Sequence, residues 1–155
     1  MGMGMHKFES IMSNDIMREF KKIRGRTLMN HSFNSCSIEA AISIASVFCP
    51  EIIEVGDYIF ISEFYNGNID SLEKEFNKDR KKIEMWVNSW ALADFFREAY
   101  DNSVDNDKIL EEFGKAIKHF WSLRFRDLFP DRNIAVEIGD NMLGETGLAV
   151  TVYQA

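Results

Sequence analysis

The sequence predicts an α+β protein, in which an antiparallel sheet of about four strands in two hairpins is packed mainly on one face by about five helices. Three observations support this class. Apolar residues recur at helical spacing over long stretches, two β-rich runs flank Gly56-Asp57, and two alternating runs follow Pro130 near the carboxyl end. Strands grouped in hairpins, rather than alternating singly with helices, indicate an antiparallel sheet.

The first fifty residues predict two helices separated by a loop. Between Lys7 and Arg24 the apolar residues recur at three- and four-residue steps, and Gly25 can end that helix. Residues 26–35 are mostly polar and predict a loop. Ser35 or Ser37 can cap a second helix that runs to Phe48. This second helix is apolar nearly all round, so we expect it inside the domain.

The next stretch predicts a β-hairpin around Gly56-Asp57, because glycine accepts the positive φ of a tight hairpin turn. Its strands, within residues 51–64, place Ile53, Val55, Tyr58 and Phe60 on one face and Ile52, Ile59 and Ile61 on the other. Both faces are therefore largely apolar. This pattern is typical of a sheet that is covered on one side and partly covered on the other, and an interface would show the same pattern.

Helical spacing returns over residues 70–100, with a break expected at Asn77-Lys78-Asp79 and with Asn88 and Asp94 as polar core candidates. A last amphipathic helix follows the acidic connector 101–107 and ends near Pro130. Two alternating strands, 133–138 and 148–153, form the second hairpin. We expect both hairpins to lie in one antiparallel sheet.

Length and charge limit the classes of protein that fit. The 155 residues suit one globular domain over 1–155, with residues 1–6 expected to be flexible. A net charge of −7 argues against nucleic-acid binding, which requires a basic surface. No apolar run approaches the ~20 residues of a membrane span, and the start lacks a signal-peptide pattern. We therefore expect a cytoplasmic protein that binds no membrane.

Catalytic candidates are few. Cys36 is the one thiol we consider as a nucleophile, with His31 or His119 as its base, and a structural thiol is the competing interpretation. The only other cysteine is Cys49, so reduced thiols are expected. No metal-ligand spacing, phosphate-binding loop or dinucleotide fingerprint occurs, and we expect no metal and no cofactor.

Binding candidates are aromatic and basic residues, namely Trp86, Trp90, Tyr100, Arg124, Arg126 and Arg132. The arginines surround Phe129-Pro130 and could clamp an anion. In a competing interpretation, their positive charges stabilise the carboxyl end of the last helix, or they form ion pairs with Asp127 and Asp131.

These observations favour a small non-catalytic cytoplasmic interaction protein, for example a bacterial immunity or antitoxin-like inhibitor of a basic partner. Its contacts are expected from acids of residues 101–107 and from Trp86, Trp90 and Tyr100. The simplest alternative is a homodimer, in which a second copy of the chain covers one face of the hairpin that is apolar on both sides. A small thiol enzyme around Cys36 and a carrier of an apolar small ligand are two further hypotheses for the function.

Overall fold

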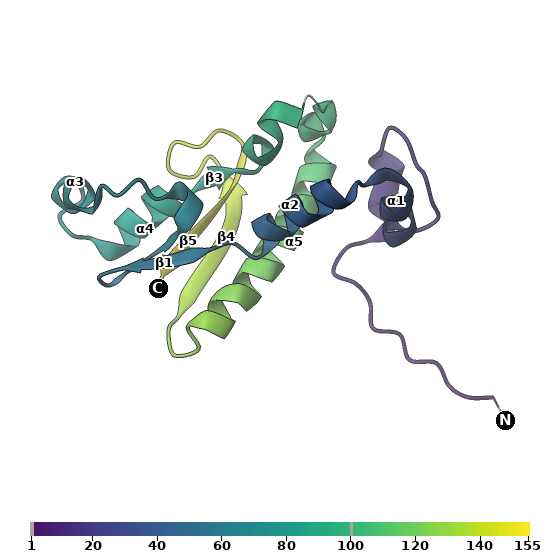
Figure 1. Cartoon of the computed structure of the whole chain (residues 1–155), viewed down its shortest axis with the longest axis horizontal. Coiled ribbons are helices and arrows are strands. Elements are labelled where there is room, and N and C mark those ends of the chain that lie inside the picture. Colours follow the sequence, from purple (N-terminus) through teal and green to yellow (C-terminus); the bar gives the residue numbers. More distant parts are fainter. Residues whose placement is uncertain (1, 100) are drawn as a thin grey trace.

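The computed structural model describes residues 2–99 and 101–155, and its main body contains two small antiparallel sheets with helices against them (Figure 1). Strands β1 (Ile52–Val55) and β2 (Tyr58–Ile61) form the first sheet. Strands β3 (Trp90–Ala91), β5 (Leu148–Gln154) and β4 (Ile134–Asp140) form the second, in that order. The predicted α+β class is therefore confirmed, but the predicted single sheet of four strands is wrong.

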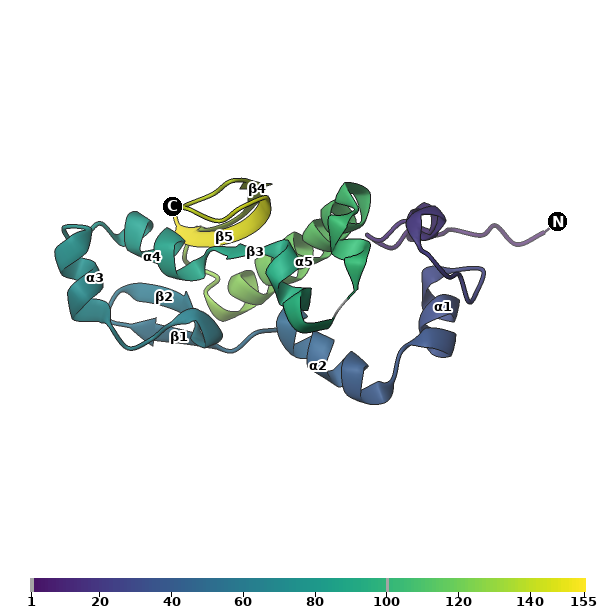
Figure 2. The same cartoon turned by 90° about the horizontal axis from the view of Figure 1, so that it is seen from above.

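The carboxyl-terminal block forms as the sequence predicts. Helix α5 (Asp107–Leu128) begins after Asn106, whose side chain accepts hydrogen bonds from the backbone N–H groups of Lys108 and Ile109. Strands β4 and β5 pair with Val136 opposite Val152. Helix α5 lies against this sheet (Figure 2) and shares one core with it, made of the buried side chains of Ile117, Trp121, Phe125, Val136, Val150 and Val152.

The predicted first hairpin is also confirmed. Gly56 has a φ of +60°, and Val55 pairs with Tyr58 across the turn. The two faces of β2 belong to different cores, since Ile59 and Ile61 pack with α5 and β5 whereas Tyr58 and Phe60 pack with Leu72, Ile83 and Val87. The apolar residues on both faces of β2 are thus covered within one chain.

The middle of the chain holds one element that the sequence did not reveal. Helix α3 (Ile69–Glu75) and helix α4 (Arg80–Asn88) are separated at the predicted break, where Asn77 and Lys78 take positive φ values. The helical pattern expected to continue from α4 is instead interrupted by β3, which pairs with Ala149 and Val150 of β5. The segment η3 (Leu92–Ala99) follows, in which two short 3-10 stretches meet at a kink at Phe96, and the 3-10 helix η4 (Asn102–Asp105) comes after it.

Helix α4 explains why the two hairpins do not join into one sheet. Its residues Glu84 and Asn88 are fully buried, and their side chains hydrogen-bond the backbone of both β2 and β5. The edges of β2 and β5 that could have paired with each other are therefore occupied by side chains of a helix.

The amino-terminal region differs most from expectation. The helix predicted over Lys7–Arg24 is reduced to the short 3-10 helix η1 (Asn14–Glu19), and α1 (Leu28–Ser35) occupies the predicted loop, with Thr27 as its N-cap. Helix α2 (Ile38–Phe48) is capped by Ser37, one of the two predicted caps, and contains no buried residue. The prediction that this helix lies inside the domain is therefore wrong.

We call residues 14–49 the arm, which projects from the body (Figures 1 and 2).

No helix of the described residues is both long and apolar enough to cross a membrane.

Candidate functional site

The arm is attached to the body at its two ends. At the first end, Glu19 accepts hydrogen bonds from Asn106 Nδ2 at 3.0 Å and Lys108 Nζ at 3.3 Å. These two bonds, the Asn106 bond first, lower the pKa of the Glu19 carboxyl below its usual range. At the other end, Trp121 Nε1 donates to the Val47 carbonyl at 2.7 Å, and the Phe48 ring packs against Phe120. Between these anchors, neither α1 nor α2 contains a buried residue.

Helices α1 and α2 expose large apolar side chains that a domain core would normally enclose. The exposed fractions are 70% and 72% for Met29 and Phe33 on α1, and 76% and 66% for Ile38 and Ile42 on α2. Glu39 is the only Asp, Glu, Lys or Arg between Thr27 and Cys49. We call these four side chains the α1–α2 surface. Exposed apolar side chains can take part in contacts with other molecules when they form a contiguous patch.

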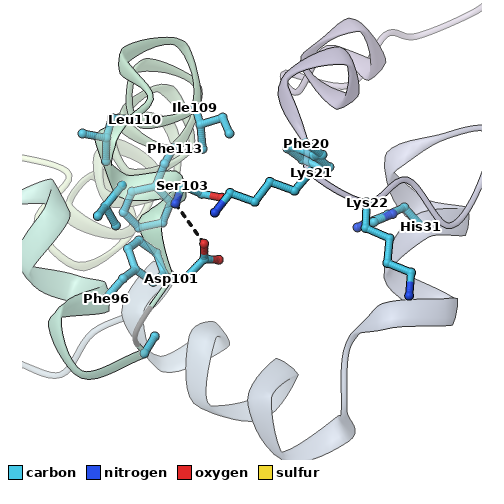
Figure 3. A pocket seen from close by; sticks show the side chains of 12 residues that line it. Phe20, Lys21, Lys22, His31, Phe96, Asp101, Ser103, Ile109, Leu110 and Phe113 are labelled. Atoms are coloured by element: carbon cyan, nitrogen blue, oxygen red, sulfur yellow. Dashed lines mark hydrogen bonds between the residues drawn. The ribbon is translucent and has the colours of Figure 1, made fainter.

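A cleft of about 470 Å³ lies between the arm and the body (Figure 3). Its body side is mainly apolar, whereas the arm contributes cationic and aromatic groups, and the labelled lining residues are Phe20, Lys21, Lys22, His31, Phe96, Asp101, Ser103, Ile109, Leu110 and Phe113. The Lys21 side chain extends from the arm toward Asp101 (Figure 3). The pKa of Asp101 is lowered, first by hydrogen bonds from Ser103 and to a smaller extent by the Lys21 charge.

The predicted thiol site is spread over separate environments. Cys36 follows α1, is exposed, and its Sγ lies 3.4 Å from the Ser37 carbonyl oxygen. His31 Nδ1 accepts a hydrogen bond from the Arg24 N–H, and its ring packs on Phe20. His119 is exposed on α5. Within the described ranges no hydrogen bond joins Cys36 to either histidine, so a thiol site remains only a prediction.

The predicted aromatic binding residues are placed on different elements. Trp86 lies on α4 with 49% of its surface exposed, and its ring packs against Phe76. Trp90 lies on β3, half-buried, with its ring stacked on Phe64 at 4.9 Å between centroids. Tyr100 lies outside the described residues. The role of all three as partner contacts stays a prediction.

The three arginines near Pro130 contact different parts of the molecule. Arg124 Nε donates to the Pro50 carbonyl at 3.2 Å, whereas Arg132 forms an ion pair with Glu54 at 3.0 Å and lies over the Phe129 ring. Arg126 is exposed in the last turn of α5, where a positive charge is favourable. In the part of the chain that the structure describes, no ion pair links these arginines to Asp127 or Asp131.

A second cavity, the aromatic pocket, lies where α2 meets the body and has a volume of about 430 Å³. Phe64, Trp90, Phe95 and Trp121 line it, together with the carboxyl-bearing residues Glu51, Glu63 and Asp94 and with Ser46 and Val47 of α2. No lysine, arginine or histidine is among its lining residues. The pocket is therefore both aromatic and negatively charged.

Sequence reasoning named Trp90, which lines the aromatic pocket, but did not anticipate the exposed apolar side chains of α1 and α2. The apolar character of residues 38–48 was evident and was assigned to the core, because a helix that is apolar nearly all round is usually buried. Apart from Glu39, the residues between Thr27 and Cys49 carry no Asp, Glu, Lys or Arg, and this was the sequence feature that accompanies the exposed apolar side chains. Among residues 2–99 and 101–155, no three His, Cys, Asp or Glu side chains are placed to hold one metal ion.

No protein-family model, curated protein or solved structure matches this chain.

Proposed function

We propose that this protein acts without catalysis, by binding another protein through the α1–α2 surface. The observation that carries the proposal is the exposure of Met29, Phe33, Ile38 and Ile42, each above 60%, on two successive helices. Such side chains gain free energy when a partner removes them from water. None of these four side chains belongs to either hydrophobic core cluster of the described residues.

The free energy gained by burying these side chains limits how tightly the α1–α2 surface can bind a partner on its own. Fully burying one side chain of this size contributes about 1.5–3 kcal/mol. Association costs roughly 4–15 kcal/mol in lost freedom of motion. The α1–α2 surface can therefore anchor a partner, but a stable complex requires further contacts next to it.

The charge distribution supports a basic partner. Residues 50–155 carry 21 Asp and Glu against 12 Lys and Arg, a net charge of −9, whereas residues 1–49 carry four against six, a net charge of +2. A basic protein would be drawn toward the acidic body as it approaches the apolar arm. An inhibitor of the bacterial immunity or antitoxin type, acting in the cytoplasm, is the concrete form of this proposal.

One observation favours a second candidate function. The cleft between arm and body has a volume of about 470 Å³, within the range of small-ligand sites, and much of its lining is apolar. A carrier of an apolar small molecule would use this cleft and would leave the α1–α2 surface uncovered.

Affinity purification from the native cell tests the leading proposal when three forms of the chain are compared. The wild type and the control Leu143→Glu, which changes a side chain 41% exposed on the body, should retain the same basic partner. The double variant Ile38→Glu/Ile42→Glu should lose it, because two charges enter the apolar contact.

An identical set of retained proteins for all three forms would contradict the proposal. The mass in solution adds a second criterion, since the chain alone has a mass of 18.0 kDa. A dimer that the double variant abolishes would show that the surface binds a second copy, against the proposal of a basic partner. A co-purifying small molecule, with no protein, would favour the carrier function instead.

A further inference from the structure

We infer that the aromatic pocket receives a cationic side chain, a lysine or an arginine, presented by the protein partner. This inference rests on the proposed function and specifies what the second contact beside the α1–α2 surface recognises. Its starting point is a cavity of about 430 Å³ whose walls combine four aromatic rings with three carboxylates.

The aromatic walls are held in place by contacts with one another. The rings of Phe64 and Trp90 are stacked, and Phe95 meets both Trp90 and Trp121 edge-on, with centroids 6.5 Å and 6.4 Å apart. Trp121 is itself fixed, because it is buried and donates its indole N–H to Val47. Aromatic rings attract cations through their electron-rich faces, and tryptophan does so most strongly.

The carboxylates of the pocket have unequal freedom to bind a cation. Glu51 accepts a hydrogen bond from the Ser62 hydroxyl at 2.6 Å, and Asp94 pairs with Arg97 at 2.7 Å. Glu63 is exposed on η2 (Ser62–Phe64), and no ion pair of the described residues includes it. Glu63 is therefore the carboxylate best placed to meet an incoming charge, and Glu51 adds to the negative potential, whereas the charge of Asp94 is offset by Arg97.

The pocket also continues the α1–α2 surface. Ile42 of that surface and Ser46 of the pocket are four residues apart on α2, so their side chains lie one turn apart on the same side of the helix. A partner that covers Ile42 would reach the pocket with its next side chain. Arginine is among the residue types that most often dominate the binding energy of an interface, and such residues typically lie in well-packed pockets.

Nuclear magnetic resonance of the indole N–H groups tests this inference on the isolated protein. The probes are Nα-acetylarginine amide and Nα-acetyllysine amide, and the control is Nα-acetylcitrulline amide, which has nearly the shape of arginine without its charge. Trp90 and Trp121 line the pocket, whereas Trp86 does not and serves as an internal reference. We expect at least one of the two cationic probes to shift the Trp90 and Trp121 signals saturably. The citrulline control should not shift them, and the Trp86 signal should stay unchanged.

Two variants with the same change of charge sharpen the test. Glu63→Gln should weaken binding of the cationic probe by about two- to fivefold, as expected for one partly exposed charge pair. Glu111→Gln, on the exposed face of α5, should leave the affinity unchanged.

The variant Trp90→Leu removes the stacked ring and tests the aromatic contribution. If urea titrations show that it does not fold, Phe64→Leu takes its place. Either variant should reduce the affinity further than Glu63→Gln.

The inference is overturned if the citrulline control shifts the signals equally, if no probe produces saturable shifts, or if the two glutamate variants behave alike. These failures leave the α1–α2 proposal intact, since its test depends on Ile38 and Ile42 and not on the pocket. Conversely, the uncharged double variant Ile38→Ser/Ile42→Ser should bind the cationic probe as the wild type does, which supports a pocket that works independently of the apolar contact.

Discussion

Glu84 and Asn88 lie one turn apart on α4 and together hydrogen-bond the open edges of strands β2 and β5. The Glu84 carboxylate accepts from the Ile59 N–H at 2.8 Å and from the Gln154 N–H at 2.9 Å. The Asn88 amide accepts from the Ile61 N–H and donates to the carbonyls of Ile59 and Val152 at 3.0–3.1 Å. These two side chains thus replace the backbone pairing that would have joined the two sheets.

Glu84→Ala should destabilise the protein strongly. The substitution leaves the N–H groups of Ile59 and Gln154, and the Gln154 side-chain amide, buried without their acceptor. Losing several buried hydrogen bonds and leaving their donors unsatisfied costs about 3–5 kcal/mol. Urea unfolding measures the loss, and Glu84→Gln, which keeps the volume, should lose less. Glu75→Ala, exposed on α3, is the control and should stay within ~0.5 kcal/mol of the wild type.

The apolar residues of the arm should contribute little to folding stability. Ile38→Ser/Ile42→Ser changes two exposed side chains of α2, so the free energy of unfolding should change by no more than about 1 kcal/mol. Ile117→Ala, in the core between α5 and the sheet, should cost about 2–5 kcal/mol. Thermal or urea unfolding of both variants makes the comparison. A double variant as unstable as Ile117→Ala would mean that α2 is packed in solution, and the α1–α2 surface would not exist.

Acid should weaken the attachment of the first end of the arm. The pKa of Glu19 is lowered in the folded protein, so its bonds to Asn106 and Lys108 contribute stability above the ordinary glutamate pKa of about 4.3. That contribution is lost as the pH falls through the lowered value. Hydrogen exchange of residues 14–20 should therefore accelerate at acid pH relative to exchange in α5.

Glu19→Gln is the matched variant for this prediction. It should show faster exchange in residues 14–20 already at neutral pH, with a smaller further change on acidification, because the titrating group has been removed. Equal pH dependence in the two proteins would assign the effect to another carboxyl group.

Tyr153 should make a contribution to stability that disappears at alkaline pH. Its hydroxyl donates a hydrogen bond to Glu137, and this bond, with burial second, raises the pKa of Tyr153. A raised pKa means that the stabilisation is complete below the ordinary tyrosine pKa of about 10 and is lost as the pH rises toward the folded value. Tyr153→Phe should be less stable than the wild type at neutral pH. The difference in the free energy of unfolding between the two proteins, measured by urea unfolding, should narrow above a pH of about 10. A difference that stays constant with pH would contradict the assignment.

The sequence predicted the elements whose signals are local. The turn at Gly56, the cap at Ser37 and the alternation in 148–153 each depend on a few neighbouring residues, and each formed as expected. The strand β3 was missed because two residues, Trp90 and Ala91, are too few to show a period, and their pairing depends on the distant Ala149 and Val150. Secondary structure that is fixed by a partner far along the chain leaves little local pattern.

Tertiary placement was harder to predict than local structure. Asn88 was recognised as a polar core candidate, but the role of Glu84 was not, because a buried carboxylate depends on donors from Ile59 and Gln154 that only the fold brings to it. Likewise, an apolar helix gives the same pattern whether it enters a core or contacts a partner. The sequence of α2 could therefore define its bounds without revealing that Ile38 and Ile42 are exposed.

Photo-crosslinking from the α1–α2 surface in the living cell tests the central claim most directly. A photoreactive phenylalanine analogue at Phe33, which is 72% exposed on α1, should give a covalent adduct with one basic protein. The same analogue at Leu143, in the loop between β4 and β5 of the body, should not give that adduct, and Ile38→Glu/Ile42→Glu should abolish it. An equal yield from both positions, or an adduct that survives the double variant, would contradict binding through the α1–α2 surface.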